Sequence, residues 1–230
     1  MEAVLSSLSE AHALIISSEP EGYGALLGLY VGIFYVTVAI MALGAVVAVM
    51  RRDIWIFIRS IEAITRFFGY LSACIIPLLA VLIAYEVIAR YAFRAPTPWA
   101  FEISYMLMGT CFLLAIAFCL QLRRHIRVDF LYDHVSPKKR ATIDFVGFVF
   151  FLLPMVLWCS WGLWEYFLAA YKVNEVSGES AWNPIIWPFK FVFAFGFYLL
   201  GIQTVAEICK CVLVLMGRDV PAPQAAGGFK

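Results

Sequence analysis

Charged residues are scarce in this sequence. Asp, Glu, Lys and Arg together make up 14% of the 230 residues, against about 25% in a typical soluble domain. Hydrophobic residues make up 63% and aromatic residues 17%. A chain with so little charge lacks the polar surface of an ordinary soluble protein, so the composition excludes that class and indicates a membrane protein.

Histidine is rarer still, and several kinds of chemistry depend on it. The three histidines all lie outside the long hydrophobic stretches, whereas membrane haem proteins need axial histidines within facing helices. The sequence also lacks a glycine-rich phosphate or dinucleotide loop and a supported Ser-His-Asp or Cys-His arrangement. Cys209 and Cys211 are close together, but no further histidine or cysteine completes a metal site around them. We therefore expect no enzyme activity, no cofactor and no metal site.

Long uncharged stretches take the place of these motifs. About 20 apolar residues in a helix span a hydrocarbon core about 30 Å thick. Because the bilayer interior offers no water to bond the backbone, each such stretch must be helical. Five stretches span or nearly span the bilayer: 23–50, 67–85, 103–122, 145–164 and 191–206. The expected fold is an all-α integral membrane protein with five transmembrane helices.

The positive charges predict the orientation. Of the 17 Lys and Arg residues, four lie in segments on one side of the five spans and thirteen on the other. Because the richer side is normally cytoplasmic, the N-terminus is expected outside and the C-terminus in the cytoplasm. The predicted order is an outer tail, an extra transmembrane helix, a cytoplasmic amphipathic helix, a four-helix core and a disordered cytoplasmic tail: 1–22, 23–50, 51–66, 67–217 and 218–230.

Residues 51–66 have the pattern of an amphipathic helix that lies in the plane of the membrane. Apolar side chains between Ile54 and Phe68 gather on one helical face. Glu62 is placed to pair with one of two neighbouring arginines. Such a helix would rest on the cytoplasmic leaflet near phospholipid phosphates; the alternative is a charged helical linker. The residues expected at this lipid interface are Arg52, Trp55, Arg59 and Arg66.

Five charged residues lie toward the outer ends of the spans: Glu86, Arg90, Arg94, Glu102 and Glu165. Glu86 and Arg90 are four residues apart on one helix, a spacing that favours an ion pair. Glu102 begins the next helix and is expected to pair with Arg90 or Arg94, whereas Glu165 has no basic residue nearby. The group is either a proton or cation site or an interhelical ion-pair cluster, and its position near the membrane interface favours the cluster.

Glycines recur every four residues in the first span, at Gly24, Gly28 and Gly32. Small residues at this spacing let a second helix approach closely. The face would pack against a neighbouring helix of this chain or against a partner subunit.

The chain from about 65 to 217 resembles the small membrane subunit (DctQ type) of tripartite ATP-independent periplasmic (TRAP) transporters. Trp99 and Glu102 open one span, Gly178-Glu179-Ser180 precedes the last span, and Gln203 lies within that span. A basic run between them contributes Arg123, Arg124, His125, Arg127 and Asp129. The family core usually has four spanning helices, so the span 23–50 would be additional.

The resemblance implies a role in a three-component transporter of the bacterial inner membrane. A periplasmic binding protein (DctP type) captures a substrate, usually an organic acid. A large permease subunit (DctM type) moves it across by an elevator motion driven by a sodium gradient. The small subunit packs against the large one as a fixed scaffold and offers a surface to the binding protein. The implied partners are these two proteins and membrane phospholipids, with no nucleic acid.

Three segments receive specific roles. Trp99 and Glu102 are predicted to fix the outer end of the helix that they begin. The run from Arg123 to Asp129 is predicted to be a structured cytoplasmic turn, in which His125 and Asp129 hold backbone or partner groups. The loop 175–188 is predicted to face the binding protein.

Two other functions remain open from the residues alone. One is a membrane anchor subunit of a redox enzyme, against which the lack of histidine within the spans argues. The other is a self-contained transporter, against which the lack of broken helix pairs and of an inverted repeat argues.

Overall fold

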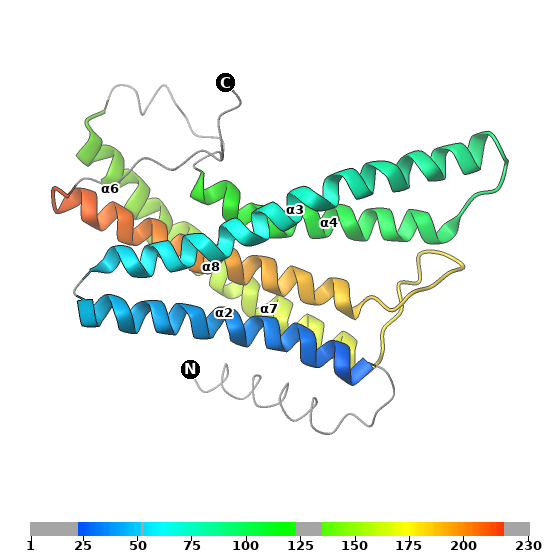
Figure 1. The fold of residues 1–230 in the computed structure, drawn as a ribbon, viewed down its shortest axis with the longest axis horizontal. Helices are drawn as coiled ribbons and strands as arrows, with labels where there is room; N and C mark the ends of the chain where they lie inside the picture. Colours follow the sequence, from blue (N-terminus) through cyan, green and yellow to red (C-terminus); the bar gives the residue numbers. More distant parts are fainter. Residues whose placement is uncertain (1–22, 52, 123–134, 219–230) are drawn as a thin grey trace.

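The described part of the chain is helical throughout its spans. The computed structural model describes residues 23–51, 53–122 and 135–218. In chain order its elements are α2 (Tyr23–Arg51), α3 (Ile54–Tyr91), α4 (Pro98–Gln121), α6 (Pro137–Gly147), the π-helical η1 (Phe148–Leu152), α7 (Leu153–Lys172) and α8 (Trp187–Leu215). Figure 1 shows them as a bundle of long helices. The predicted all-α class is confirmed.

Four helices in the described residues are long and apolar enough to cross a membrane: Ile54–Tyr91, Pro98–Gln121, Pro137–Lys172 and Trp187–Leu215. They contain the last four predicted spans. The first predicted span lies in α2, which has 29 residues. The loops 92–97 and 173–186 lie at one end of the bundle, which we call the outer end after the predicted orientation, and the opposite end is the inner end (Figure 1).

The helix boundaries follow from residues that cap or start helices. The carboxylate of Asp53 accepts a hydrogen bond from the backbone N–H of Trp55 (3.0 Å) at the start of α3. Prolines occupy the first turns of α4 and α8, at Pro98 and Pro188, where a missing N–H costs nothing. Gly217, with φ of 76°, follows the end of α8 and supplies the left-handed conformation of a helix terminus.

Elements α6, η1 and α7 form one continuous apolar helix. Its π-helical turn lies directly before Pro154, where the N–H of Leu153 bonds the carbonyl of Phe148, five residues back. Proline clashes with the carbonyl four residues before it and cannot bond it. The wider turn accommodates both defects, so the helix departs from α geometry next to the proline.

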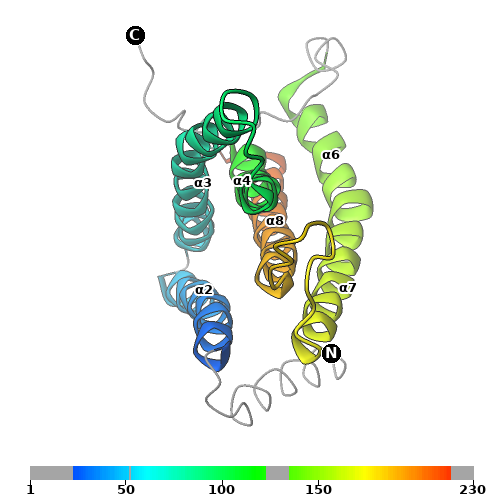
Figure 2. The ribbon, with the colours of Figure 1, turned by 90° about the vertical axis from the view of Figure 1, so that its right-hand side faces the viewer.

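Helix α8 lies at the centre of the bundle. Its most apolar stretch is 61% buried, against 6–22% for the other three candidate spans. Figure 2 shows α3, α4 and the α6–α7 helix around it, with α2 beside α3. At Gly196, an added Cβ would lie 2.8 Å from the carbonyl oxygen of Leu113, so the backbones of α8 and α4 are nearly in contact.

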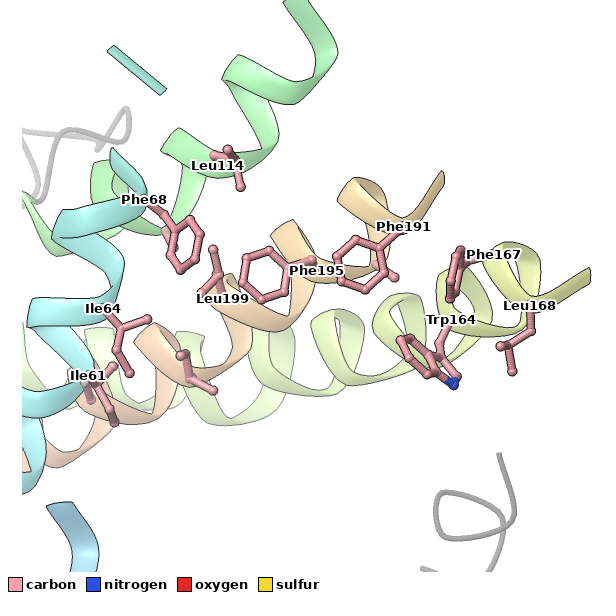
Figure 3. Packing of buried hydrophobic residues seen from close by; sticks show 14 of the residues in the cluster. Ile61, Ile64, Phe68, Leu114, Trp164, Phe167, Leu168, Phe191, Phe195 and Leu199 are labelled. Carbon is pink, nitrogen blue, oxygen red and sulfur yellow. The ribbon is translucent and has the colours of Figure 1, made fainter. Parts of the chain in front are cut away.

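Aromatic side chains on α8 join it to its neighbours (Figure 3). The ring of Phe195 stacks on Phe191 (centroids 5.8 Å apart) and meets Phe68 of α3 edge-on (4.9 Å). Phe191 in turn contacts Phe167 of α7 at 5.3 Å. Rings in such offset and edge-on arrangements attract each other beyond the area they bury, so this row holds three helices together.

The predicted amphipathic segment is part of a spanning helix. α3 runs without interruption from Ile54 to Tyr91, so no boundary separates 51–66 from the span that follows. Ile58 and Ile61 are 0% exposed and belong to the bundle core, whereas Arg59 is exposed. The apolar face of this segment is therefore covered by protein. The segment is therefore not a separate helix, and its predicted position in the plane of the membrane stays a prediction.

Candidate functional site

At the outer end, α3 is tied to the start of α4 by the carboxylate of Glu86. Its Oε1 accepts hydrogen bonds from Nη2 (2.6 Å) and Nε (3.1 Å) of Arg90. Its Oε2 accepts from the backbone N–H (3.2 Å) and the hydroxyl of Thr97. The predicted pairing of Glu86 with Arg90 is therefore present, and Thr97 adds the link between the helices.

Glu102 has a different partner from the one the sequence predicted. Its side chain is 0% exposed, and its Oε1 accepts a hydrogen bond from the hydroxyl of Ser180 in the loop before α8. Its Oε2 is buried without a hydrogen-bond partner. The predicted pairing with Arg90 or Arg94 is wrong, because Glu102 faces the second outer loop and Arg90 is bonded to Glu86.

The loop 173–186 is an ordered hairpin that presents Ser180 to this carboxylate. Val176 and Ile185 form an antiparallel bridge. Gly178 has φ of 69°, a conformation that favours glycine, and its N–H donates to the side-chain oxygen of Asn183 (2.7 Å). In the Gly178-Glu179-Ser180 sequence the glycine therefore makes the turn and the serine makes the contact with the bundle.

A buried lysine fixes the base of the same hairpin. The side chain of Lys190 on α8 is 4% exposed, and its Nζ donates to Oε2 of Glu175 at 2.5 Å. The ammonium also lies 3.6 Å from the ring centroid of Tyr166 on α7, a distance at which a cation is attracted to the ring face. The hairpin is thus held by charged or polar groups at two points.

The inner half of the bundle contains a buried polar network that the sequence reasoning missed. The hydroxyl of Thr65 lies 2.9 Å from Oε1 of Gln121 and 3.1 Å from Oε1 of Gln203. The Nε2 of Gln203 donates to Oε1 of Glu207 (3.0 Å). Lys210 donates to the same oxygen. The network therefore joins α3, α4 and α8 through polar groups inside the bundle.

Glu62 completes this network. Its Oε1 accepts from Nζ of Lys210 at 3.0 Å, so the predicted pairing of Glu62 with Arg59 or Arg66 is wrong. The side chains of Glu207 and Lys210 are 1% and 6% exposed. The spacing of Gln203, Glu207 and Lys210 on one face of α8 was the available signal, since polar residues inside a span face protein.

Comparison with protein-family models gives a match over residues 79–213, more than half of the chain, to the DctQ component of tripartite ATP-independent periplasmic transporters. The chain belongs to the DctQ family. No curated protein and no solved structure matches it. The match begins within α3, so α2 lies outside the part that the family model covers.

The residues on which the predicted resemblance rested fall partly within the described residues. Trp99 packs its ring near Tyr85 of α3 at 5.7 Å, and Glu102 meets Ser180 as described above. Arg123, Arg124, His125, Arg127 and Asp129 lie in 123–134, outside the described residues. Their roles stay predictions, as does the role of Arg52.

The remaining predicted residues do not gather into one site. In the described part of the chain, neither Arg94 nor Glu165 joins the Glu86–Arg90 pair, so the outer charges form separate contacts. Gly28 and Gly32 have open space where a Cβ would stand, and they line an apolar groove of about 990 Å³ between α2 and α3. Their packing partner is therefore not within the described chain.

Replacing Ser180 by alanine should loosen the outer hairpin. The carboxylate of Glu102 would stay buried with neither oxygen bonded, a loss of about 1–3 kcal/mol in the free energy of unfolding. Thermal unfolding of the purified protein in mild detergent measures this loss. Ser136→Ala is the matched control, because Ser136 is exposed and makes no capping bond. Equal melting temperatures for the two variants would contradict the contact.

Proposed function

We propose that this DctQ component is the fixed scaffold of a sodium-driven TRAP transporter for organic acids. In this proposal it holds the large permease subunit while part of that subunit moves. Its outer hairpin also forms part of the docking surface for the periplasmic binding protein. The family supports a small permease subunit of a TRAP transporter, and the bundle's internal contacts support the scaffold role.

The observation that carries the scaffold role is the buried polar network at the inner half of the bundle. Sliding or rotating α3 against α8 would separate Lys210 from Glu62 (3.0 Å) and leave charges unpaired in an apolar interior. The close approach of α8 and α4 at Gly196 restricts the same motion between those helices. A bundle locked in this way suits the stationary part of an elevator transporter.

The docking role rests on the hairpin 173–186. Two anchors hold it against the bundle, namely Ser180 on Glu102 and Glu175 on Lys190. It nevertheless exposes side chains, with Trp182 46% exposed. Preorganised surfaces that present an aromatic side chain bind with little ordering cost, so this hairpin supplies a rigid contact for a protein on the outer side.

Reconstitution in liposomes tests the proposal. Uptake of an organic acid should require this chain, the large permease subunit, the binding protein and an inward sodium gradient together, and this chain alone should move nothing. Trp182→Ala should lower uptake while leaving the amount of assembled permease unchanged. Met216→Ala is its control, because Met216 is 72% exposed at the opposite end of the bundle. Uptake by this chain alone would overturn the proposal.

A further inference from the structure

Glu165 is a carboxylate on the outside of a membrane-spanning helix. It lies on α7, seven residues before the final Lys172, which places it about 10 Å inside the helix end at 1.5 Å per residue. The side chain is exposed, and among the described residues it makes no ion pair or hydrogen bond. A glutamate side chain is too short to bring its charge back to water over that distance.

The packing of its neighbours confirms this depth within the bundle. Trp164 lies 6.5 Å and Phe167 lies 5.3 Å from the ring of Phe191, one turn inside α8. The aromatic pair that marks the outer boundary, Tyr171 and Trp187, lies beyond this level (centroids 5.2 Å apart). Glu165 is therefore at the level of the aromatic row of α8, next to Tyr166, whose ring the buried ammonium of Lys190 meets. A charge that faces lipid at this level is costly.

Glu165 lacks the hydrogen-bond partner that every other acidic residue of α3, α4, α7 and α8 has. Each of the other four accepts a hydrogen bond within the chain: Glu62 and Glu207 from Lys210, Glu86 from Arg90, and Glu102 from Ser180. The sequence thus places a partner opposite every acidic group inside these helices except this one. Among the described residues, Glu165 alone of these five acidic groups has no partner.

The surface around Glu165 is shaped to admit another helix. Met155, Trp158, Gly162, Glu165 and Ala169 follow one another at three- and four-residue intervals, so they form one stripe on α7, and all five are exposed. A Cβ at Gly162 would meet nothing within 4 Å. Small residues on both sides of Glu165 leave the helix backbone open to close approach.

Two other occupants fit this stripe poorly. A second copy of the chain inserted in the same orientation and related by an axis normal to the membrane would bring Glu165 against Glu165, since a symmetric contact pairs like with like. A phospholipid would offer an anionic phosphate, and only at the membrane surface. A cationic side chain on a transmembrane helix satisfies both the charge and the depth.

We propose that the α7 stripe centred on Glu165 docks a transmembrane helix of the large permease subunit that presents a lysine or arginine at the same depth. The inference rests on the proposed function, because it takes the permease as the partner. The permease would then cover the α7 face of this chain, and the carboxylate of Glu165 would select the permease helix that binds there. Contact through one charge pair in an apolar interface also fixes the register of the two helices.

Co-purification of the permease with tagged variants of this chain tests the inference. Glu165→Leu should lower permease recovery about tenfold or more, and Glu165→Lys should lower it further. The isolated Glu165→Leu chain should melt no lower than wild type, because in this account the carboxylate has no partner inside the chain. Lys139→Glu is the matched control, since it reverses an exposed charge in the first turn of α6 and should leave permease recovery unchanged.

Each outcome decides a separate point. Full permease recovery with both Glu165 variants would overturn the inference and leave the proposed function standing. A lower melting temperature of the isolated Glu165→Leu chain would also overturn it, because the carboxylate would then have a partner within the chain. Failure of the wild-type chain to recover any permease would overturn both. A photo-cross-linker at position 165 should mark a permease helix with a basic residue, and changing that residue to glutamate should restore recovery with Glu165→Lys.

Discussion

Lys210→Met should destabilise the chain by about 3–5 kcal/mol, because it leaves two carboxylates without their cation inside the bundle. Nζ of Lys210 donates to both Glu207 and Glu62, and its side chain is 6% exposed. Methionine has a similar volume, so the loss would come from the charge and not from a cavity. Unfolding of the purified protein by heat or by a denaturing detergent measures the change.

Matched variants separate the buried network from a general effect of removing a lysine. Lys138→Met should change stability by less than about 0.5 kcal/mol, because Lys138 is exposed at the start of α6. Adding Glu207→Gln and Glu62→Gln to Lys210→Met should recover much of the loss, because no buried charge then remains unpaired. A Lys210→Met protein that unfolds like the Lys138→Met protein would show that the network contributes nothing to stability.

Gly196→Leu should destabilise the bundle by about 3 kcal/mol, at the upper end of the range for overpacked cores. An added Cβ at this position would lie 2.8 Å from the carbonyl oxygen of Leu113. Backbone atoms of α4 cannot rotate away as a side chain can, so α4 and α8 would have to separate. The expected result is a lower melting temperature and weaker association of the two helices.

The same substitution at an open position is the control. Gly147→Leu on α6 should leave stability unchanged or raise it by up to about 1 kcal/mol, because a Cβ there meets nothing within 4 Å and leucine favours the helix over glycine. A loss of stability with Gly196→Leu and a gain with Gly147→Leu would establish that close packing, and not helix propensity, decides the outcome at Gly196. A loss of the same size at both would contradict this account of the α4–α8 contact.

The spans were predictable because hydropathy records the thickness of the bilayer directly. The four candidate spans contain the last four stretches chosen from the sequence. Local pairs were also accessible, as with Glu86 and Arg90, since four residues on a helix bring side chains together. Both kinds of information lie within one continuous stretch of the chain.

Contacts between helices were not predictable, because they depend on how each helix is rotated and where it crosses its neighbours. Glu62 has Arg59 and Arg66 nearby in sequence, yet its partner is Lys210, 148 residues later. Glu102 likewise meets Ser180 and not the arginines close to it. Periodicity showed an apolar face between Ile54 and Phe68. It could not show whether protein or lipid covers that face, since both are apolar.

Purification of the tagged chain from its native membrane in mild detergent, with mass spectrometry of the proteins that accompany it, tests the central claim most directly. A large polytopic permease should accompany the chain in an amount close to that of the chain itself. Recovery of the chain alone, or with the subunits of a redox enzyme, would contradict its role as the small subunit of a transporter.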